Sequence, residues 1–154
     1  MTSRTKLLRG ALVALAAAVV LIQFVPVART NPPVTGDIPA PADAKAVIRR
    51  ACYDCHSNES KWPWYSHVAP VSWLVTHDVN EARRKMNFSE WNKLSADKQA
   101  RNLRNALEEI EGKDMPPKIY VPMHPDARLG DADMAILHAW ITSTAPGAHD
   151  EDGD

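Results

Sequence analysis

Two cysteines and a histidine stand together in the stretch Cys-Tyr-Asp-Cys-His at residues 52–56. Cys52 and Cys55 are the only cysteines in the chain of 154 residues, and His56 directly follows the second. Two thiols at this spacing can close a disulfide, form a redox-active pair or supply ligands to a zinc ion. With an adjoining histidine, they also match the attachment motif of a c-type haem. The surrounding sequence helps to distinguish these four chemistries.

The first three chemistries fit this context poorly. A disulfide across a two-residue gap closes a very small loop and so stabilises the fold little. A thioredoxin-like redox pair follows a strand in a βαβ unit, whereas a helical pattern precedes this motif. A zinc site needs a second pair of ligands at short spacing, yet His67 and His77 are ten positions apart and no further cysteine exists.

The haem chemistry accounts for all three side chains. Cys52 and Cys55 would form thioether bonds to the two vinyl groups of the porphyrin, and His56 would bind the iron as its proximal ligand. A haem is a large apolar group, so it would also complete the core of a small chain that contains 12 prolines. The sequence therefore predicts haem c as the cofactor at these residues.

The ligand on the other side of the iron decides what the haem can do. A methionine gives an electron carrier of high potential, a second histidine gives a lower potential, and an open position permits ligand binding or peroxidase chemistry. Met115 lies in Lys-Asp-Met-Pro-Pro, where two prolines stiffen the loop, and it is the predicted distal ligand. Met123, in Val-Pro-Met-His-Pro, is the alternative, and His124 beside it comes third. Met86 and Met134 fall on apolar helical stripes and are predicted to belong to the core.

Aromatic side chains gather shortly after the cysteine motif. Trp62, Trp64 and Tyr65 could cover the edge of a porphyrin or donate hydrogen bonds to its propionates. Ordinary packing of the loop onto the helices explains them equally well. The basic run at residues 83–85 is open in the same way, as a docking patch for an acidic redox partner or as a solvated helix face.

The N-terminal 28 residues carry three basic and no acidic side chains, and an apolar run extends from residue 10 to residue 28. This pattern is typical of a cleaved signal peptide or of an uncleaved membrane anchor at residues 1–28. The run approaches the length that spans a bilayer, and residues 26–28 make a poor cleavage site, so an anchor is favoured. In either case the rest of the chain is predicted to be exported.

The remaining sequence divides into three parts. Residues 29–42 are a proline-rich linker, residues 43–144 form the c-type haem-binding domain, and residues 145–154 are an acidic, disordered tail. No convincing period-two pattern of a strand appears, so the domain is predicted to be all-α.

Apolar spacing and capping residues place the helices of this domain. The first starts with Asp43 as a possible N-cap and runs directly into the cysteine motif. The second covers residues 70–86, and its apolar stripe consists of Val71, Leu74, Val75, Val79, Ala82 and Met86. The third follows Ser95 and stops at Gly112, and the last covers residues 131–142.

Two resemblances follow from these motifs. The order of a helix, the cysteine motif, a Met-Pro loop and a C-terminal helix resembles a class I cytochrome c, which implies a small helical domain around a covalent haem. Residues 43–142 are more closely similar to the bacterial haem-binding domain family, notably in the stretch from Trp62 to Trp91 and in Asp-Met-Pro-Pro. This resemblance implies haem carriage in the bacterial cell envelope, with the cysteine motif and Met115 holding the haem.

The favoured function is a monohaem c-type cytochrome that carries electrons between redox partner proteins on the extracytoplasmic, periplasmic side of the membrane, with the N-terminal helix as its anchor. One alternative is a peroxidase-like enzyme in which His67 or His77 supplies a distal acid-base group. Another is a haem-based redox or gas sensor. No catalytic constellation stands out elsewhere, which favours the carrier over an enzyme. Nucleic-acid binding is not expected, because the net charge is -1 and no basic face is evident.

Overall fold

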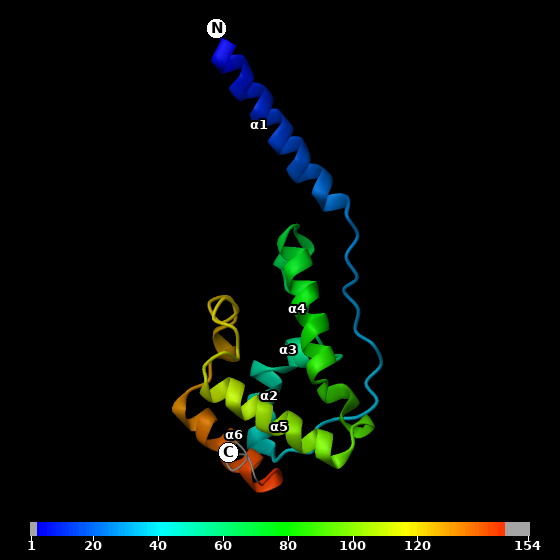
Figure 1. Ribbon diagram of the computed structural model, residues 1–154, viewed down its shortest axis with the longest axis vertical. Coiled ribbons are helices and arrows are strands. Elements are labelled where there is room, and N and C mark those ends of the chain that lie inside the picture. Colours follow the sequence, from blue (N-terminus) through cyan, green and yellow to red (C-terminus); the bar gives the residue numbers. More distant parts are fainter. Residues whose placement is uncertain (1–2, 147–154) are drawn as a thin grey trace, which may run out of the picture.

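The computed structural model describes residues 3–146, so the acidic tail lies almost wholly outside the described residues. Within them the regular structure is helical and no strand occurs, which confirms the predicted all-α class (Figure 1). The α-helices are α1 (Ser3–Leu21), α2 (Ala42–Ala51), α3 (Tyr53–His56), α4 (Val71–Lys85), α5 (Ala96–Glu111) and α6 (Asp131–Thr144). Short 3-10 helices are η1 (Ile22–Phe24), η2 (Trp64–His67), η3 (Phe88–Lys93) and η4 (Pro125–Ala127).

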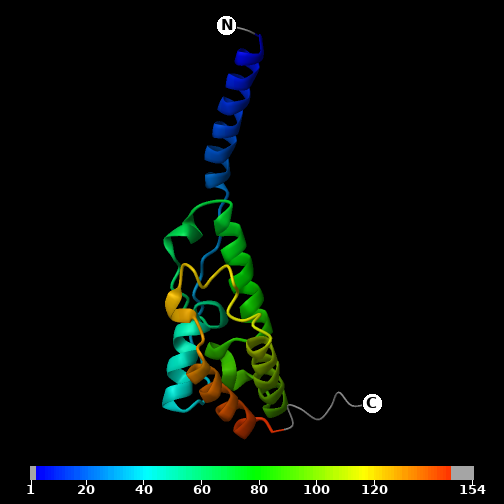
Figure 2. The same ribbon diagram turned by 90° about the vertical axis from the view of Figure 1, so that its left-hand side faces the viewer.

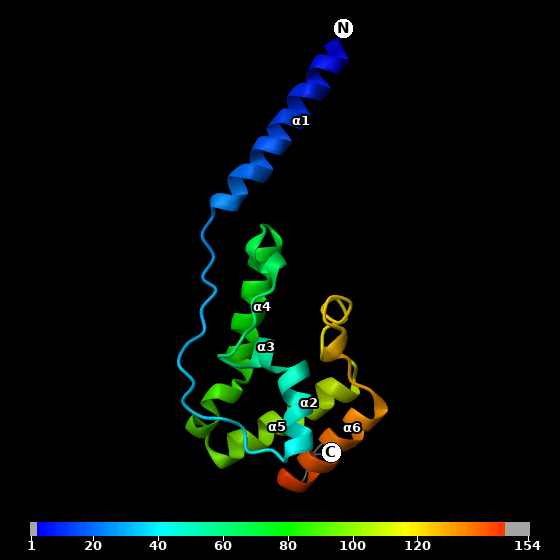
Figure 3. The same cartoon turned by 180° about the vertical axis from the view of Figure 1, so that it is seen from behind.

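Helices α2, α5 and α6 form the base of the domain (Figures 1 and 3). Helix α6 packs against both α2 and α5. The apolar side chains of the three helices meet in one buried cluster, which includes Val47, Leu103, Leu107, Leu137 and Ile141. Burial of apolar surface is the dominant favourable term in folding, so this cluster is what fixes the base.

The helix ends largely follow the predicted capping residues. The Ser95 side chain accepts a hydrogen bond from the Lys98 backbone N–H at 3.3 Å and so caps α5, which has Gly112 at its other end. Asp43 is not the N-cap that the sequence suggested, because the N-cap is Pro41 and α2 begins at Ala42. The Asp43 carboxylate lies instead in the first turn, where the partial positive charge of the helix N-terminus stabilises it.

Helix α4 and the loop after α5 rise from one side of the base as two arms (Figures 1 and 3). Helix α4 packs against α3 and η2. Its buried side chains are Ser72, Thr76, Val79 and Ala82. Of the predicted apolar stripe, Val79 and Ala82 are buried as expected, whereas Val71 and Leu74 are exposed. In the first two turns of α4, the buried face carries the small hydroxyl side chains of Ser72 and Thr76. The larger apolar side chains therefore point to the other side.

Residues 29–41 of the predicted linker have no helix or strand, and they lie along the domain. The backbone N–H groups of Thr35 and Gly36 both donate to the Ser89 carbonyl at 3.0 Å. Ile38 is buried within the apolar cluster of the base. These contacts fix the path of the segment beside α4 and η3, while the domain boundary at residue 43 stays a prediction.

Arg83 joins this segment to the loop after the cysteine motif. Its guanidinium donates to the Ser57 carbonyl and to the Thr30 carbonyl, each at 2.7 Å. It also donates to the Asn31 side-chain oxygen at 2.9 Å. Arg83 is therefore committed to contacts within the chain, so neither the docking patch nor the solvated helix face describes it.

Helix α1 points away from the domain (Figure 2). Residues Ser3–Phe24 form an apolar helix of 22 residues, long enough to cross a membrane and equally consistent with a signal sequence. At its end, the Gln23 side chain donates to the Ala69 carbonyl at 3.1 Å and accepts from the Ala69 N–H at 2.9 Å. This pair of hydrogen bonds joins the end of the apolar helix to the segment just before α4.

Candidate haem site

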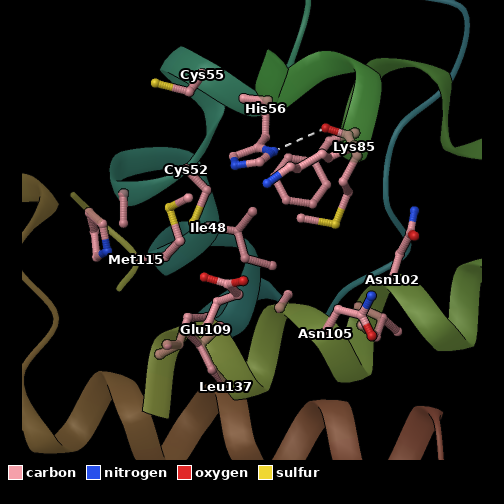
Figure 4. A pocket seen from close by; sticks show the side chains of 18 of the residues that line it. Ile48, Cys52, Cys55, His56, Lys85, Asn102, Asn105, Glu109, Met115 and Leu137 are labelled. Atoms are coloured by element: carbon pink, nitrogen blue, oxygen red, sulfur yellow. Dashed lines mark hydrogen bonds between the residues drawn. The ribbon is translucent and has the colours of Figure 1, made fainter. Parts of the chain in front are cut away.

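A cavity of about 670 Å³ opens between α2, α3, the end of α4, α5, α6 and the loop after α5 (Figure 4). Its volume lies in the ordinary range for ligand and cofactor sites, roughly 300–1,000 Å³. Its walls are largely apolar and include Ile48, Phe88, Leu103, Leu137 and Ile141. All three side chains of the cysteine motif line the same cavity. The local sequence motif and the tertiary cavity therefore coincide.

The motif is wound into a single helical turn. The backbone N–H of His56 donates to the Cys52 carbonyl at 2.9 Å, which brings the ends of the motif together. The His56 Nδ1 lies 3.1 Å from the Met86 carbonyl oxygen, drawn as the dashed line in Figure 4. A carbonyl can only accept, so Nδ1 carries the proton and the lone pair resides on Nε2. A hydrogen bond of this kind orients most metal-binding histidines.

Burial lowers the pKa of His56 below its ordinary value. The lowered pKa favours the neutral ring, which is the form that can bind a metal ion. The Phe88 ring, with its centroid 6.1 Å from that of the imidazole, forms part of the apolar surroundings. Burial thus outweighs the hydrogen bond to Met86, which by itself raises the pKa, and keeps the imidazole neutral. The hydrogen bond fixes the tautomer, with the lone pair on Nε2.

Both cysteines are free thiols in the structure. Burial raises the pKa of Cys52 to about 12 and that of Cys55 to about 11. The thiolate is the reactive form in redox exchange, so burial of these thiols disfavours redox chemistry. Among residues 3–146, no group of three or more His, Cys, Asp or Glu side chains is placed to hold a metal ion. This agrees with the sequence argument that a second pair of zinc ligands is missing.

Met115 lies in the same cavity, on the loop that leaves α5. Its backbone N–H donates to the Glu109 carbonyl at 3.1 Å, and two prolines follow it, so the loop is restrained on both sides of the side chain. Met123, the alternative distal ligand, is 55% exposed and lines a different cavity. The structure thus brings Met115, and not Met123, into the cavity of His56.

A second cavity of about 290 Å³ lies between the two arms and adjoins the first. Trp62, Trp64 and Tyr65 line it and do not line the first cavity. Cys55 and Tyr120 line both. The three aromatic residues are therefore neighbours of the motif, and their contact with a haem stays a prediction.

The remaining histidine candidates lie outside the first cavity. His124 has its Nε2 hydrogen-bonded to the Tyr65 hydroxyl at 2.6 Å, and its ring stacks on Tyr120 with the centroids 3.9 Å apart. These contacts bridge the two arms and occupy the nitrogen that an iron ion would need. His67 and His77, the acid-base groups of the enzyme alternative, are exposed and line neither cavity.

The side chains present fit a haem. The apolar walls suit a porphyrin ring, the Nε2 of His56 is free, and two protonated thiols stand within one helical turn of it. A thioether in Met115 faces the same space. The chemistry of this donor set is that of iron held by nitrogen and sulfur.

These features define an all-helical protein with an apolar cofactor cavity beside a Cys-x-x-Cys-His motif. The sequence matches the haem-binding domain family over residues 17–143. Because this match covers most of the chain, the protein belongs to that family and binds haem. The predicted family is thereby confirmed. Neither the curated proteins nor the solved structures contain a match to the sequence.

Two parts of the cavity could not be found from the sequence. The Met86 carbonyl that orients His56 is a backbone group, and no residue type marks it. Asn102 is buried in the cavity wall, although the sequence places it beside the apolar stripe of α5 among polar residues. A polar residue next to a stripe is usually solvated, so only its tertiary surroundings reveal it.

Proposed function

We propose that this haem-binding protein is a monohaem c-type cytochrome that carries electrons. The observation that carries the proposal is the His56 imidazole, held through Nδ1 by the Met86 carbonyl inside a cavity that Cys52, Cys55 and Met115 also line. In this proposal His56 and Met115 would bind the iron, and the two cysteines would hold the porphyrin through thioether bonds.

A bound haem supplies a reversible one-electron change at its iron. The chain's own residues set the conditions for this change. The carbonyl of Met86 keeps the imidazole in one tautomer and one orientation. The apolar walls limit access of water, which disfavours the more highly charged oxidised state and so raises the reduction potential. A thioether ligand from Met115 raises it further.

The proposed place of action is the extracytoplasmic side of a membrane. The apolar helix Ser3–Phe24 is long enough to act as the anchor. The Gln23 hydrogen bonds to Ala69 would hold the domain close to the end of that helix, and therefore near the membrane surface. Redox proteins at this surface are the proposed partners.

The first test asks whether the haem is bound covalently, through thioether bonds to Cys52 and Cys55. Acidic organic solvent extracts haem that is bound only by its iron, whereas thioether-bound haem stays with the chain. We expect the wild-type chain to retain its haem and the Cys52→Ala/Cys55→Ala variant to release it. A wild-type chain that loses its haem in the solvent would contradict the c-type assignment.

The second test concerns the sixth ligand. A methionine bound to ferric haem gives a weak near-infrared absorption band. We expect this band in the wild type and in Met123→Ala, which is the matched control, and not in Met115→Ala. If Met115→Ala kept the band, the distal ligand would be another residue and the assignment of Met115 would be wrong.

A further inference from the structure

Asn102 is a buried polar side chain with an unused hydrogen-bond donor. Its residue is only 5% exposed, and its Nδ2 has no hydrogen-bond partner among the described residues. A buried donor of this kind costs free energy unless a ligand or water accepts from it. Asn102 also lines the cavity that holds the cysteine motif. The unused donor therefore belongs to the haem site.

The face of α5 that lines this cavity is polar at the end where Asn102 lies. Lys98 precedes Asn102 by four residues and Asn105 follows it by three, so the three side chains share one helix face, and all three line the cavity. Together they offer two amide groups and one ammonium group. This combination of donors suits a carboxylate.

Two of the three acidic side chains of the cavity wall lie toward its other end. Glu109 is near Met115 in Figure 4, and Asp78 lines both cavities together with Cys55. Both would repel a carboxylate near the cysteines. The third, Glu81, pairs with Arg84, and Lys85 lies beside His56 in Figure 4. The amide donors of α5 are therefore the polar groups that lie away from the motif.

The shape of a haem matches this arrangement. Its two vinyl groups and its two propionate carboxylates occupy opposite edges of the porphyrin. In Figure 4, Cys52 and Cys55 lie to one side of His56, and Asn102 and Asn105 lie to the other. A haem whose vinyl edge meets the cysteines would point its propionates toward the amides.

We propose that Asn102, assisted by Lys98 and Asn105, is the binding site for the haem propionates. Asn102 donates from Nδ2 to a propionate oxygen, and the Lys98 ammonium contributes its charge at the exposed rim. This inference rests on the haem orientation of the proposed function. It adds to that function a group that fixes the second edge of the porphyrin without touching the iron.

The test compares haem with haem dimethyl ester, which lacks the carboxylate charges. Both are titrated into the full-length Cys52→Ala/Cys55→Ala chain, and the change in the Soret band gives each Kd. We expect haem to bind about tenfold more tightly than the ester, as the loss of a hydrogen bond to a charged group implies. Adding Asn102→Leu, which keeps the size of the side chain, should remove this preference by weakening haem binding alone.

The matched control is Asn80→Leu, because Asn80 is exposed on α4 and lines neither cavity. It should leave the preference unchanged. An equal affinity of the parent chain for haem and ester would overturn the proposal, and so would a preference that survives Asn102→Leu. A general loss of fold would weaken both ligands equally, so it cannot imitate the expected result.

A second measurement uses the chain with its cysteines intact, in case the cysteine-free chain binds neither ligand. The resonance Raman band of propionate bending should shift in Asn102→Leu and stay in place in Asn80→Leu. An unchanged band in Asn102→Leu would overturn the proposal. Release of haem from the wild type in acidic solvent would instead contradict the c-type assignment, and the ester comparison would still decide the role of Asn102.

Discussion

The two adjoining cavities differ in what their side chains are free to do. In the first, the Met86 carbonyl takes Nδ1 of His56 and leaves the lone pair on Nε2, and the Nδ2 of Asn102 has no hydrogen-bond partner among the described residues. In the second, the polar groups already bind one another, as the Tyr65–His124 hydrogen bond and the Tyr120–Asp54 hydrogen bond show. The first cavity is thus prepared for a ligand, whereas the second is tied together by its own walls.

The two cavities also distinguish two methionines that have similar neighbours in the sequence. Met115 and Met123 both lie beside prolines in one loop, and each lines one cavity. Only the cavity of Met115 also contains a histidine whose metal-binding nitrogen is free. A methionine is a plausible iron ligand where such a histidine faces it, so the pairing carries more information than either motif alone.

The largest expected effect separates His56, which lines the first cavity, from His124, which is hydrogen-bonded to Tyr65 in the wall of the second. In the Cys52→Ala/Cys55→Ala chain, adding His56→Ala should weaken haem binding by more than the roughly 10–100-fold that loss of an outer-shell partner costs, because it removes the ligand itself. Adding His124→Ala should change it little. A Soret titration measures both. If His124→Ala had the larger effect, the second cavity would be the haem site.

The next effect separates the cavity walls. Leu137 is 1% exposed and lines the first cavity, and Leu74 is 50% exposed and lines the second. We expect Leu137→Ala to lower the free energy of unfolding by about 2–5 kcal/mol. Leu74→Ala should lower it by less than about 1 kcal/mol, because little apolar surface is buried there. Urea unfolding of the two variants gives the difference, and equal losses would contradict the distinction between the walls.

The methionines provide a smaller difference. Axial ligands set haem potentials over a range of about 0.8 V. Replacing a thioether ligand should therefore lower the potential of Met115→Ala by a modest part of this range, on the order of 0.1 V. Met123→Ala should leave it nearly unchanged. Spectroelectrochemical titration of both variants measures the shifts. A fall in Met123→Ala that matched that of Met115→Ala would remove the distinction between the cavities.

The features of the fold that could be predicted from the sequence are those whose determinants lie within one short segment. The helix that starts after Ser95 was predicted correctly, because its cap and its terminal glycine lie within the segment itself. The motif of residues 52–56 was also found, since its side chains need only one turn to come together. The buried face of α4 was predicted only in its second half, where Val79 and Ala82 are buried. The first half packs against other elements through contacts that no pattern within the helix records.

The site shows the same division. Met115 was predicted from the prolines beside it, and the structure places it in the cavity of His56. The sequence could not show that Met115 and Met123 line different cavities, because both have proline-rich surroundings. Asn102 was missed altogether, since only its burial by neighbouring elements distinguishes it from a solvated helix residue.

The smallest expected effect is that of Tyr65→Phe, and it tests most directly whether the two cavities act separately. Tyr65→Phe removes the hydroxyl that lies 2.6 Å from the His124 Nε2 and should cost about 1 kcal/mol of stability, measured by urea unfolding. Because His124 is then freed without being replaced, the haem spectrum of the variant tests whether hydrogen bonding alone keeps it from the iron. We expect an unchanged spectrum, since the His124 ring would still stack on the Tyr120 ring between the arms. A spectrum of the two-histidine type would show that His124 can displace Met115, and the two cavities would then act as one site.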